Sequence, residues 1–273
     1  MSSNAEQIEY WNGAVGERWA RLQQTIDGNL AAITKALMPF AAAAPGERVL
    51  DIGCGCGTTT MALAKAVDPG GDVTGVDISA PMLAVARSRG ARANFMEADA
   101  STHLFHPTHD LVFSRFGVMF FADPQAAFAN IRKALKPRGR IAFVCWRGTP
   151  ENLWASAPFA AARDLVPAQE PADPLAPGPF AFADGEQLRG ILAGAGFANV
   201  RVEKLDSTMN MGATAEDAAA QALNIGPLAR AAAALDDGAR EKIRDVVGKA
   251  LAKFKAADGI APPAACWLVG ATA

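Results

Sequence analysis

Short apolar runs alternate with amphipathic segments between residues 46 and 146. The runs lie near residues 48–52, 73–77, 93–97, 110–114 and 140–146. They lack the period-two alternation of a strand with one solvent-exposed face, so they are typical of parallel strands that helices cover on both sides. Asp123 followed by Pro124 marks the start of one intervening helix. The pattern predicts an α/β fold.

The flanking segments predict the remaining parts of the chain. Apolar residues recur at helical spacing before residue 46, and two further strands are expected at residues 197–209 and 264–270. Prolines are frequent after residue 147, which predicts an irregular segment behind a helix near residues 154–165. We therefore divide the chain into an N-terminal helical cap (1–45), a core (46–210 and 259–273) with an irregular insertion (147–181), and a helical lid (211–258).

The lid is expected to contain two alanine-rich helices. On the second, Ile243, Val247, Leu251 and Phe254 recur on one face, and basic residues lie on the other. Such a helix can pack on the protein or lie on a membrane surface. The modest charge and the many alanines favour a packed lid.

A glycine-rich loop follows the first predicted strand. Glycines stand at positions 53, 55 and 57, and we expect a side chain at any of them to lie between the main chain and a ligand. The helix after the loop is predicted to begin at about Thr58. A dinucleotide-binding loop would have its third glycine at that position, so Thr58 disfavours a nicotinamide cofactor without excluding it.

The spacing Asp51-x-Gly53-x-Gly55-x-Gly57 resembles motif I of the class I S-adenosylmethionine-dependent methyltransferases. Within that family the chain is most similar to the small-molecule enzymes of the ubiquinone and menaquinone biosynthesis type. The resemblance implies a Rossmann-like, seven-stranded, mostly parallel sheet with an antiparallel edge hairpin. It also implies that the loop passes under the methionine part of S-adenosylmethionine and that Asp51 helps to hold its ammonium group.

Further cofactor contacts are expected along the next hundred residues. Asp77 ends the second strand about 20 residues after the loop, where a carboxylate can accept both ribose hydroxyls, and Ile78 follows it. The resemblance implies that Met82 lies on the adenine face. It also implies that Asp99 accepts the adenine amino group and that the amide of Ala100 donates to a ring nitrogen.

The cap is expected to contribute aromatic side chains to the site. Trp11 and Trp19 lie within ten residues of each other, close to the only tyrosine. They can fasten the cap to the core, or they can close over the cofactor as N-terminal helices do in similar methyltransferases. We predict cofactor contacts from Trp11 and Ser114, and acceptor contacts from Trp19, Phe116, Phe120 and Trp146.

The sequence identifies no certain catalytic residue. Methyl transfer from a sulfonium needs alignment and exclusion of water, and a general base is optional. His109 is a candidate base because it adjoins a core strand, and Arg115 could hold an anionic acceptor or form a structural ion pair with the cap. The spacing of His103, His106 and His109 does not favour a metal site, because Pro107 interrupts any helix that would align them.

Composition narrows the function further. The 273-residue chain has a net charge of −2, which gives no reason to expect nucleic acid as a partner. Its four cysteines are not regularly paired and indicate a cytoplasmic location, and no stretch suggests stable membrane insertion or a signal peptide. We predict a methyltransferase with a small-molecule acceptor, no metal, and compatibility with a homodimer. The alternatives are a nicotinamide-dependent oxidoreductase and a non-catalytic cofactor-binding subunit.

Overall fold

The computed structural model describes residues 4–90, 92–168 and 176–273. Its centre is a seven-stranded sheet with the order β3-β2-β1-β4-β5-β9-β6. The strands are β1 (Arg48–Ile52), β2 (Asp72–Asp77), β3 (Asn94–Glu97), β4 (His109–Arg115), β5 (Leu135–Trp146), β6 (Ala198–Thr208) and β9 (Pro263–Thr272). The predicted seven-stranded, Rossmann-like α/β fold is therefore confirmed.

The antiparallel part of the sheet is the predicted edge hairpin, formed by β6 and β9. β9 pairs antiparallel with both β5 and β6, so β9 lies inside the sheet and β6 forms the edge. The side chains explain this order. β9 is almost entirely buried, whereas β6 carries charged residues such as Arg201 and Glu203 that suit a solvated edge.

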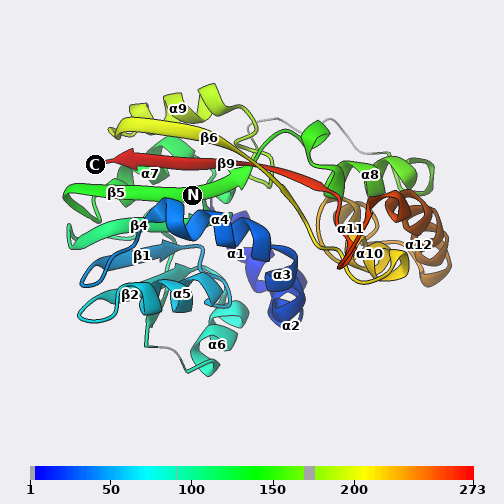
Figure 1. Cartoon of the computed structure of the whole chain (residues 1–273), viewed down its shortest axis with the longest axis horizontal. Helices are drawn as coiled ribbons and strands as arrows, with labels where there is room; N and C mark the ends of the chain where they lie inside the picture. The colour runs from blue at the N-terminus through cyan, green and yellow to red at the C-terminus, as the bar shows by residue number, and fades with distance from the viewer. Residues whose placement is uncertain (1–3, 91, 169–175) are drawn as a thin grey trace.

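Helices cover both faces of the sheet (Figure 1). α4 (Ala31–Ala41), α5 (Thr58–Ala66) and α6 (Ala80–Ser88) lie on one face, and α7 (Pro124–Arg132) and α9 (Gly185–Gly194) lie on the other. Strand order explains the division, since right-handed crossovers that step from β1 toward β3 and from β4 toward β5 place their helices on opposite faces. Asp123 caps α7 as predicted, because its side chain accepts the amide of Ala126.

Two groups of helices lie beyond the carboxyl ends of the parallel strands (Figure 1). The cap supplies α1 (Ala5–Asn12), α2 (Ala14–Arg21) and α3 (Gln23–Asn29). The other group is α8 (Leu153–Ala161), α10 (Ala215–Ala222), α11 (Pro227–Ala231) and α12 (Asp237–Leu251). Short elements complete the described chain: η1 (Gly117–Phe120), η2 (Thr149–Glu151), η3 (Arg163–Leu165), η4 (Ala252–Phe254), β7 (Lys255–Ala256) and β8 (Gly259–Ile260). Residues 169–175 of the predicted insertion, with Pro171 and Pro174, lie outside the described residues.

The segment predicted as a two-helix lid contains three helices, α10, α11 and α12. Gly226 and Pro227 start the additional helix α11. The apolar side of α12, with Ile243, Val247 and Leu251, is fully buried. α12 packs closely on α10, and a Cβ added at Gly248 would lie 3.5 Å from the carbonyl oxygen of Ala215. The membrane-surface alternative is therefore wrong, because this apolar face is already covered by protein.

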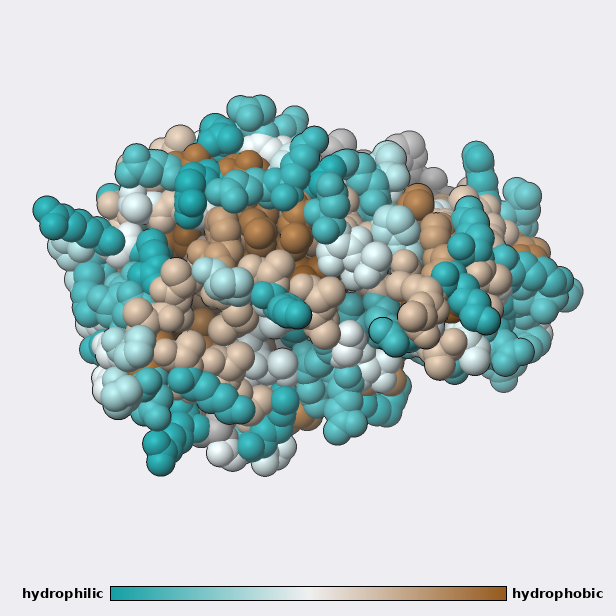
Figure 2. All heavy atoms as spheres, in the orientation of Figure 1, coloured by the Kyte–Doolittle hydropathy of each residue, from teal (hydrophilic) through white to brown (hydrophobic). Residues whose placement is uncertain are grey.

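The described helices include none that is long and apolar enough to cross a membrane. Figure 2 shows apolar surface gathered on the visible face, over the β5-β9-β6 part of the sheet. A groove of about 370 Å³ there is lined by Phe40, Ala142, Val200 and Gly270, with Arg201 among its charged residues. It lies toward the amino end of β5, away from the edge where the loop and the cap meet.

Candidate cofactor and acceptor site

The glycine loop leaves β1 and folds back on the end of β2. Gly53, Gly55 and Gly57 have φ values of 66°, 54° and 80°, a region that disfavours residues with a Cβ. The amides of Gly53 and Cys54 both donate to the carbonyl oxygen of Val76, at 2.8 and 3.1 Å. The backbone path of the loop therefore requires glycine before any ligand is considered.

The three glycines face different surroundings, which corrects the expectation that each would face a ligand. A Cβ added at Gly53 would lie 2.6 Å from Cα of Gly117, and one added at Gly57 would lie 2.8 Å from the ring of Phe95. Only Gly55 faces open space, where an added Cβ meets just the Met82 sulfur at 3.7 Å. Gly53 and Gly57 thus serve packing within the protein, and Gly55 leaves room for a ligand.

Asp51 presents one unsatisfied carboxylate oxygen at the end of β1. Its Oδ2 accepts the hydroxyls of Thr59 and Thr60 at 2.8 and 2.7 Å. Its Oδ1 is buried and has no partner among the described residues. Burial raises the pKa of Asp51 to about 6, although the two hydroxyls and the charge of Arg115 oppose this shift. An ammonium group beside Oδ1 would supply the missing partner, so this site fits the methionine end of S-adenosylmethionine.

Asp77 lies at the end of the neighbouring strand β2 and is 7% exposed. Its carboxylate accepts the amide of Gly55 at 2.7 Å and the amide of Ser79 at 2.9 Å. Burial raises its pKa, and these amide hydrogen bonds act in the opposite direction. The backbone amide of Ile78 also lowers this pKa. A carboxylate has about four lone-pair sites, so capacity remains for a predicted ribose hydroxyl.

The residues predicted around the adenine lie on the following elements. Met82 is 6% exposed, on α6, with its sulfur near Gly55. Asp99 is partly exposed, and its Oδ1 accepts the amide and the hydroxyl of Ser101 at 2.9 and 2.7 Å. Ala100 beside it is 5% exposed. These contacts hold Asp99 in a tight turn after β3, and its contact with adenine stays a prediction.

Ser114 does not have the surroundings expected of a cofactor ligand. Its side chain is fully buried, and its hydroxyl donates to the carbonyl oxygen of Ile52 at 2.7 Å. The Ser114 hydroxyl oxygen also accepts the amide of Gly117 at 3.1 Å. The hydroxyl joins the end of β1 to the turn after β4, so its donor is already used. Ser114 therefore stabilises the start of the glycine loop through hydrogen bonds within the protein.

The end of α1 is fastened to the turn after β2. The side-chain amide of Asn12 donates to the carbonyl oxygen of Ile78 at 2.8 Å, and its oxygen accepts the amide of Ala80 at 2.9 Å. The Ser79 hydroxyl donates to the carbonyl oxygen of Trp11 at 2.7 Å. These three hydrogen bonds place the cap directly beside Asp77.

Trp11 is the centre of an aromatic cluster that joins the cap to η1. Its ring meets Trp19 edge to face at a centroid distance of 5.5 Å and Phe120 at 5.2 Å. All three side chains are only partly buried. The structure thus brings together a predicted cofactor contact and two predicted acceptor contacts from separate parts of the chain.

A second aromatic row begins at the end of β4. Phe116 has a φ of 65° and stacks on Trp146 with centroids 4.2 Å apart. Trp146 is only 5% exposed and contacts Trp154, whose ring lies near Phe180. Trp146 therefore supports Phe116, which is the ring that remains partly exposed. Sequence reasoning missed Trp154 and Phe180, because they lie in a segment whose position over the sheet has no periodic signal.

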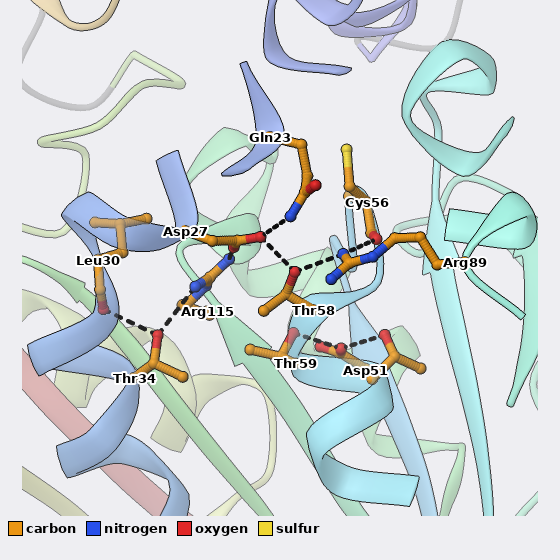
Figure 3. Close-up of polar contacts among 12 residues, drawn as sticks. Gln23, Asp27, Leu30, Thr34, Asp51, Cys56, Thr58, Thr59, Arg89 and Arg115 are labelled. Atoms are coloured by element: carbon orange, nitrogen blue, oxygen red, sulfur yellow. Dashed lines mark hydrogen bonds and ion pairs between the residues drawn. The ribbon is translucent and has the colours of Figure 1, made fainter. Parts of the chain in front are cut away.

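Arg115 is paired with the cap (Figure 3). Its guanidinium donates to Asp27 at 2.9 Å and to the hydroxyl of Thr34 at 2.9 Å. This geometry agrees with the structural ion pair and leaves Arg115 with its charge already neutralised. Asp27 was not predicted as a site residue, since a lone acid in the polar helix α3 gives no sequence signal.

His109 lies at the wrong edge of the sheet to act as the base. It is the first residue of β4, whereas Arg115 is the last. The six steps between them span roughly 20 Å at about 3.3 Å per residue. The Nδ1 atom of His109 lies 3.2 Å from the carbonyl oxygen of Ala134, and burial lowers its pKa. The prediction failed because adjacency to a strand does not say at which end a residue lies.

Comparison with known proteins finds relatives that match the central part of the chain. A protein-family profile described as a methyltransferase domain matches residues 49–139. Among curated proteins, the demethylmenaquinone methyltransferase of Staphylococcus aureus is 28% identical over 215 residues, which cover 73% of this chain and 88% of that protein. The profile match includes the glycine loop and continues into β5.

Solved structures are similar in fold over most of the chain. Phosphoethanolamine N-methyltransferase 2 of Haemonchus contortus, solved with phosphomonomethylethanolamine and S-adenosylhomocysteine, is 20% identical with a TM-score of 0.59. That match covers 97% of this chain, but the chain spans only 58% of the Haemonchus protein. The YcgJ protein of Bacillus subtilis is 18% identical with a TM-score of 0.57, and the match covers 88% of this chain and 97% of that one.

Proposed function

We propose that the chain, a class I S-adenosylmethionine-dependent methyltransferase, methylates a small, largely apolar acceptor. The acceptor is held between the cap, the ends of β4 and β5, and the helical lid (211–258). The observation that carries this proposal is the set of partly buried rings at one sheet edge, Trp19, Phe116 and Phe120. An acceptor that stacks on these rings would lie close to the glycine loop.

The protein's part in the reaction is binding, orientation and exclusion of water. When bound, S-adenosylmethionine supplies a methyl group on a sulfonium that is already a good leaving group. Asp51 would hold the ammonium group, Asp77 the ribose, and Met82 with Asp99 and Ala100 the adenine. Closure of the cap over the loop would align the acceptor and keep water out. No side-chain base is assigned, because alignment can suffice.

The charge of the site favours an apolar acceptor over a phosphorylated one. Arg115 is neutralised by Asp27, so it would have to break an ion pair to bind a phosphate. An apolar acceptor can stack on the aromatic side chains without breaking an ion pair. The Staphylococcus relative is named for an apolar quinone and the Haemonchus neighbour was solved with a phosphorylated amine. The first of these chemistries fits the surroundings of Arg115 better.

A methyl-acceptor screen tests the proposal. Demethylmenaquinone analogues, simple phenols and phosphoethanolamine are each incubated with methyl-labelled S-adenosylmethionine, and labelled product is extracted and counted. We expect label in an apolar ring compound and none in phosphoethanolamine. Label only in the phosphorylated amine would overturn the acceptor class. Tighter binding of NAD than of S-adenosylhomocysteine by calorimetry would overturn the cofactor as well.

We also propose a cytoplasmic enzyme that does not act on nucleic acid. All four cysteines are free, and three of them are buried, which is compatible with a reducing compartment. The basic residues of α12 are interrupted by acids, as in the pairs Arg244–Glu241 and Lys249–Asp245. Submicromolar tRNA binding at physiological salt that falls steeply with added salt would contradict this. The homodimer stays a prediction for sedimentation analysis.

A further inference from the structure

Asp27 joins the cap to two separate parts of the core. Its Oδ1 accepts the Arg115 guanidinium at 2.9 Å, and its Oδ2 accepts the Thr58 hydroxyl at 2.5 Å. The side-chain amide of Gln23, one turn earlier in α3, also donates to Oδ2. The exposed fractions of the Asp27 and Arg115 side chains are only 18% and 14%. Figure 3 shows Asp27 between the two partners.

Both partners of Asp27 lie next to the methionine end of the cofactor site. Thr58 is the first residue of α5, directly after Gly57, and Arg89 donates to its hydroxyl and to the carbonyl oxygen of Cys56, each at 2.7 Å. Arg115 ends β4, and its charge acts on Asp51 at the end of β1. The contacts of Asp27 therefore depend on the shape of the loop and on the group beside Asp51.

We propose that Asp27 is a positioning residue for cofactor binding, which couples closure of the cap to the conformation of the glycine loop. This inference rests on the cofactor site proposed above and adds a residue that does not itself touch the cofactor. Hydrogen bonds to a carboxylate are directional, so Asp27 can reach Thr58 and Arg115 together only when the loop and the end of β4 are in place.

The aromatic contacts of the cap cannot provide this coupling alone. Apolar packing is non-directional, so Trp11 and Trp19 could stay in contact while the loop shifts. Lifting the cap would break the ion pair of Asp27 with Arg115 and the hydrogen bond of Asp27 to Thr58 at the same time. The ion pair thus favours one closed arrangement of the cap.

The experiment compares Asp27→Asn with a matched variant, Glu47→Gln. Glu47 pairs with Arg140 at 2.7 Å, with side-chain exposures of 20% and 30%, and Arg140 also donates to the carbonyl oxygens of Ala41 and Ala42. This second ion pair joins the turn before β1 to β5, and Arg140 at the same time holds the end of α4, on the side of the sheet away from the glycine loop. It controls for the loss of one partly buried carboxylate near the cap.

S-adenosylhomocysteine binding is measured by calorimetry for the wild type and each full-length variant, with hydrogen exchange at residues 8–22 with and without ligand. We expect Asp27→Asn to weaken binding at least tenfold and to abolish the ligand-induced slowing of exchange. Asp27→Glu, which restores a carboxylate, should recover most of the affinity. Glu47→Gln should bind within twofold of the wild type.

Wild-type affinity and exchange in folded Asp27→Asn would overturn the inference, and so would equal weakening in Glu47→Gln. If Asp27→Asn does not fold, Thr58→Ala removes the other end of the same contact and should weaken binding at least threefold, with unchanged affinity overturning the coupling. A wild type that does not bind S-adenosylhomocysteine would instead overturn the proposed cofactor site.

Discussion

The amide of Gly55 donates a 2.7 Å hydrogen bond to the carboxylate of Asp77, which ends the strand next to the loop. The residue predicted to bind the ribose thus also holds the loop that passes under the methionine. Loss of this carboxylate should therefore affect two parts of the cofactor at once.

Replacement of Asp77 by Ala should weaken S-adenosylhomocysteine binding by roughly 1.5–3 kcal/mol or more, since hydrogen bonds to a charged group are lost. Calorimetry measures the affinity, and urea unfolding measures the stability. Asp72→Ala is the matched control, because Asp72 begins the same strand and is exposed. Unchanged affinity in folded Asp77→Ala would mean that the ribose lies elsewhere.

Gly53→Ala and Gly55→Ala should fail in different ways. An added Cβ at Gly53 would collide with the backbone of Gly117, so that variant should lose stability beyond the roughly 1–2 kcal/mol of a left-handed alanine. Gly55→Ala should lose only the stability that a left-handed alanine costs, but it should lose most of its cofactor affinity. Thermal unfolding and calorimetry on both variants check this. The opposite pattern would place the ligand against Gly53.

The stability of the protein should depend on Asp51 in mildly acid solution. The pKa of Asp51 is raised from 3.8 to about 6 by burial, so between these values the folded state binds a proton that the unfolded state has released. Stability contributed by this group is present below about pH 4 and is lost as pH rises to about 6, by about 3 kcal/mol at most. The difference in unfolding free energy between wild type and Asp51→Asn, from urea unfolding at pH 4 to 7, should show this slope. A constant difference would contradict the raised pKa.

Cofactor affinity should have the opposite pH dependence. An ammonium group beside Asp51 prefers the ionised carboxylate, which dominates only above about pH 6. Calorimetry with S-adenosylhomocysteine should therefore show tighter binding at pH 7 than at pH 5, by about tenfold. The dependence should be much weaker in Asp51→Asn. An equal dependence in both proteins would place the ammonium group away from Asp51.

The aromatic part of the cap should act as a lid that the cofactor orders. Asn12→Ala removes two hydrogen bonds to the turn after β2 and should weaken S-adenosylhomocysteine binding by about 1–3 kcal/mol. Hydrogen exchange at residues 8–22 should slow when ligand is added to the wild type. Equal protection with and without ligand would indicate that the cap is a fixed part of the core.

The sheet could be predicted from sequence because its signal is local. Apolar runs bounded by turns identified all seven strands, and Asp123 with Pro124 identified the start of α7. The position of β9 between β5 and β6 was harder to predict from sequence, because it depends on which of the two strands tolerates an exposed edge. The charged residues of β6 indicate that it is the edge strand, but this is clear only when its sequence is compared with that of β9.

The site was only partly accessible from sequence, for a physical reason. Asp51 and Asp77 lie at the carboxyl ends of β1 and β2, so chain position fixes their place at this edge of the sheet. Ser114 shows the limit, because a hydroxyl at a strand end can face a ligand or the next strand equally well. Asp27 shows it more strongly, since its partner Arg115 is 88 residues away. Neither the direction of the Ser114 hydroxyl nor the pairing of Asp27 with Arg115 leaves a pattern in the sequence.

The helical lid (211–258) connects two strands, β6 and β9, whose adjoining ends are paired. Thr208 at the end of β6 lies opposite Pro263 at the start of β9, and the pairing continues where the amide of Met211 donates to the carbonyl oxygen of Ile260 at 2.8 Å. Topologically, the lid occupies the position of a hairpin turn. Evolution can therefore exchange or resize this module while the parallel strands that hold the cofactor keep their register. Under the proposed function, acceptor preference and cofactor binding can therefore change independently in this architecture.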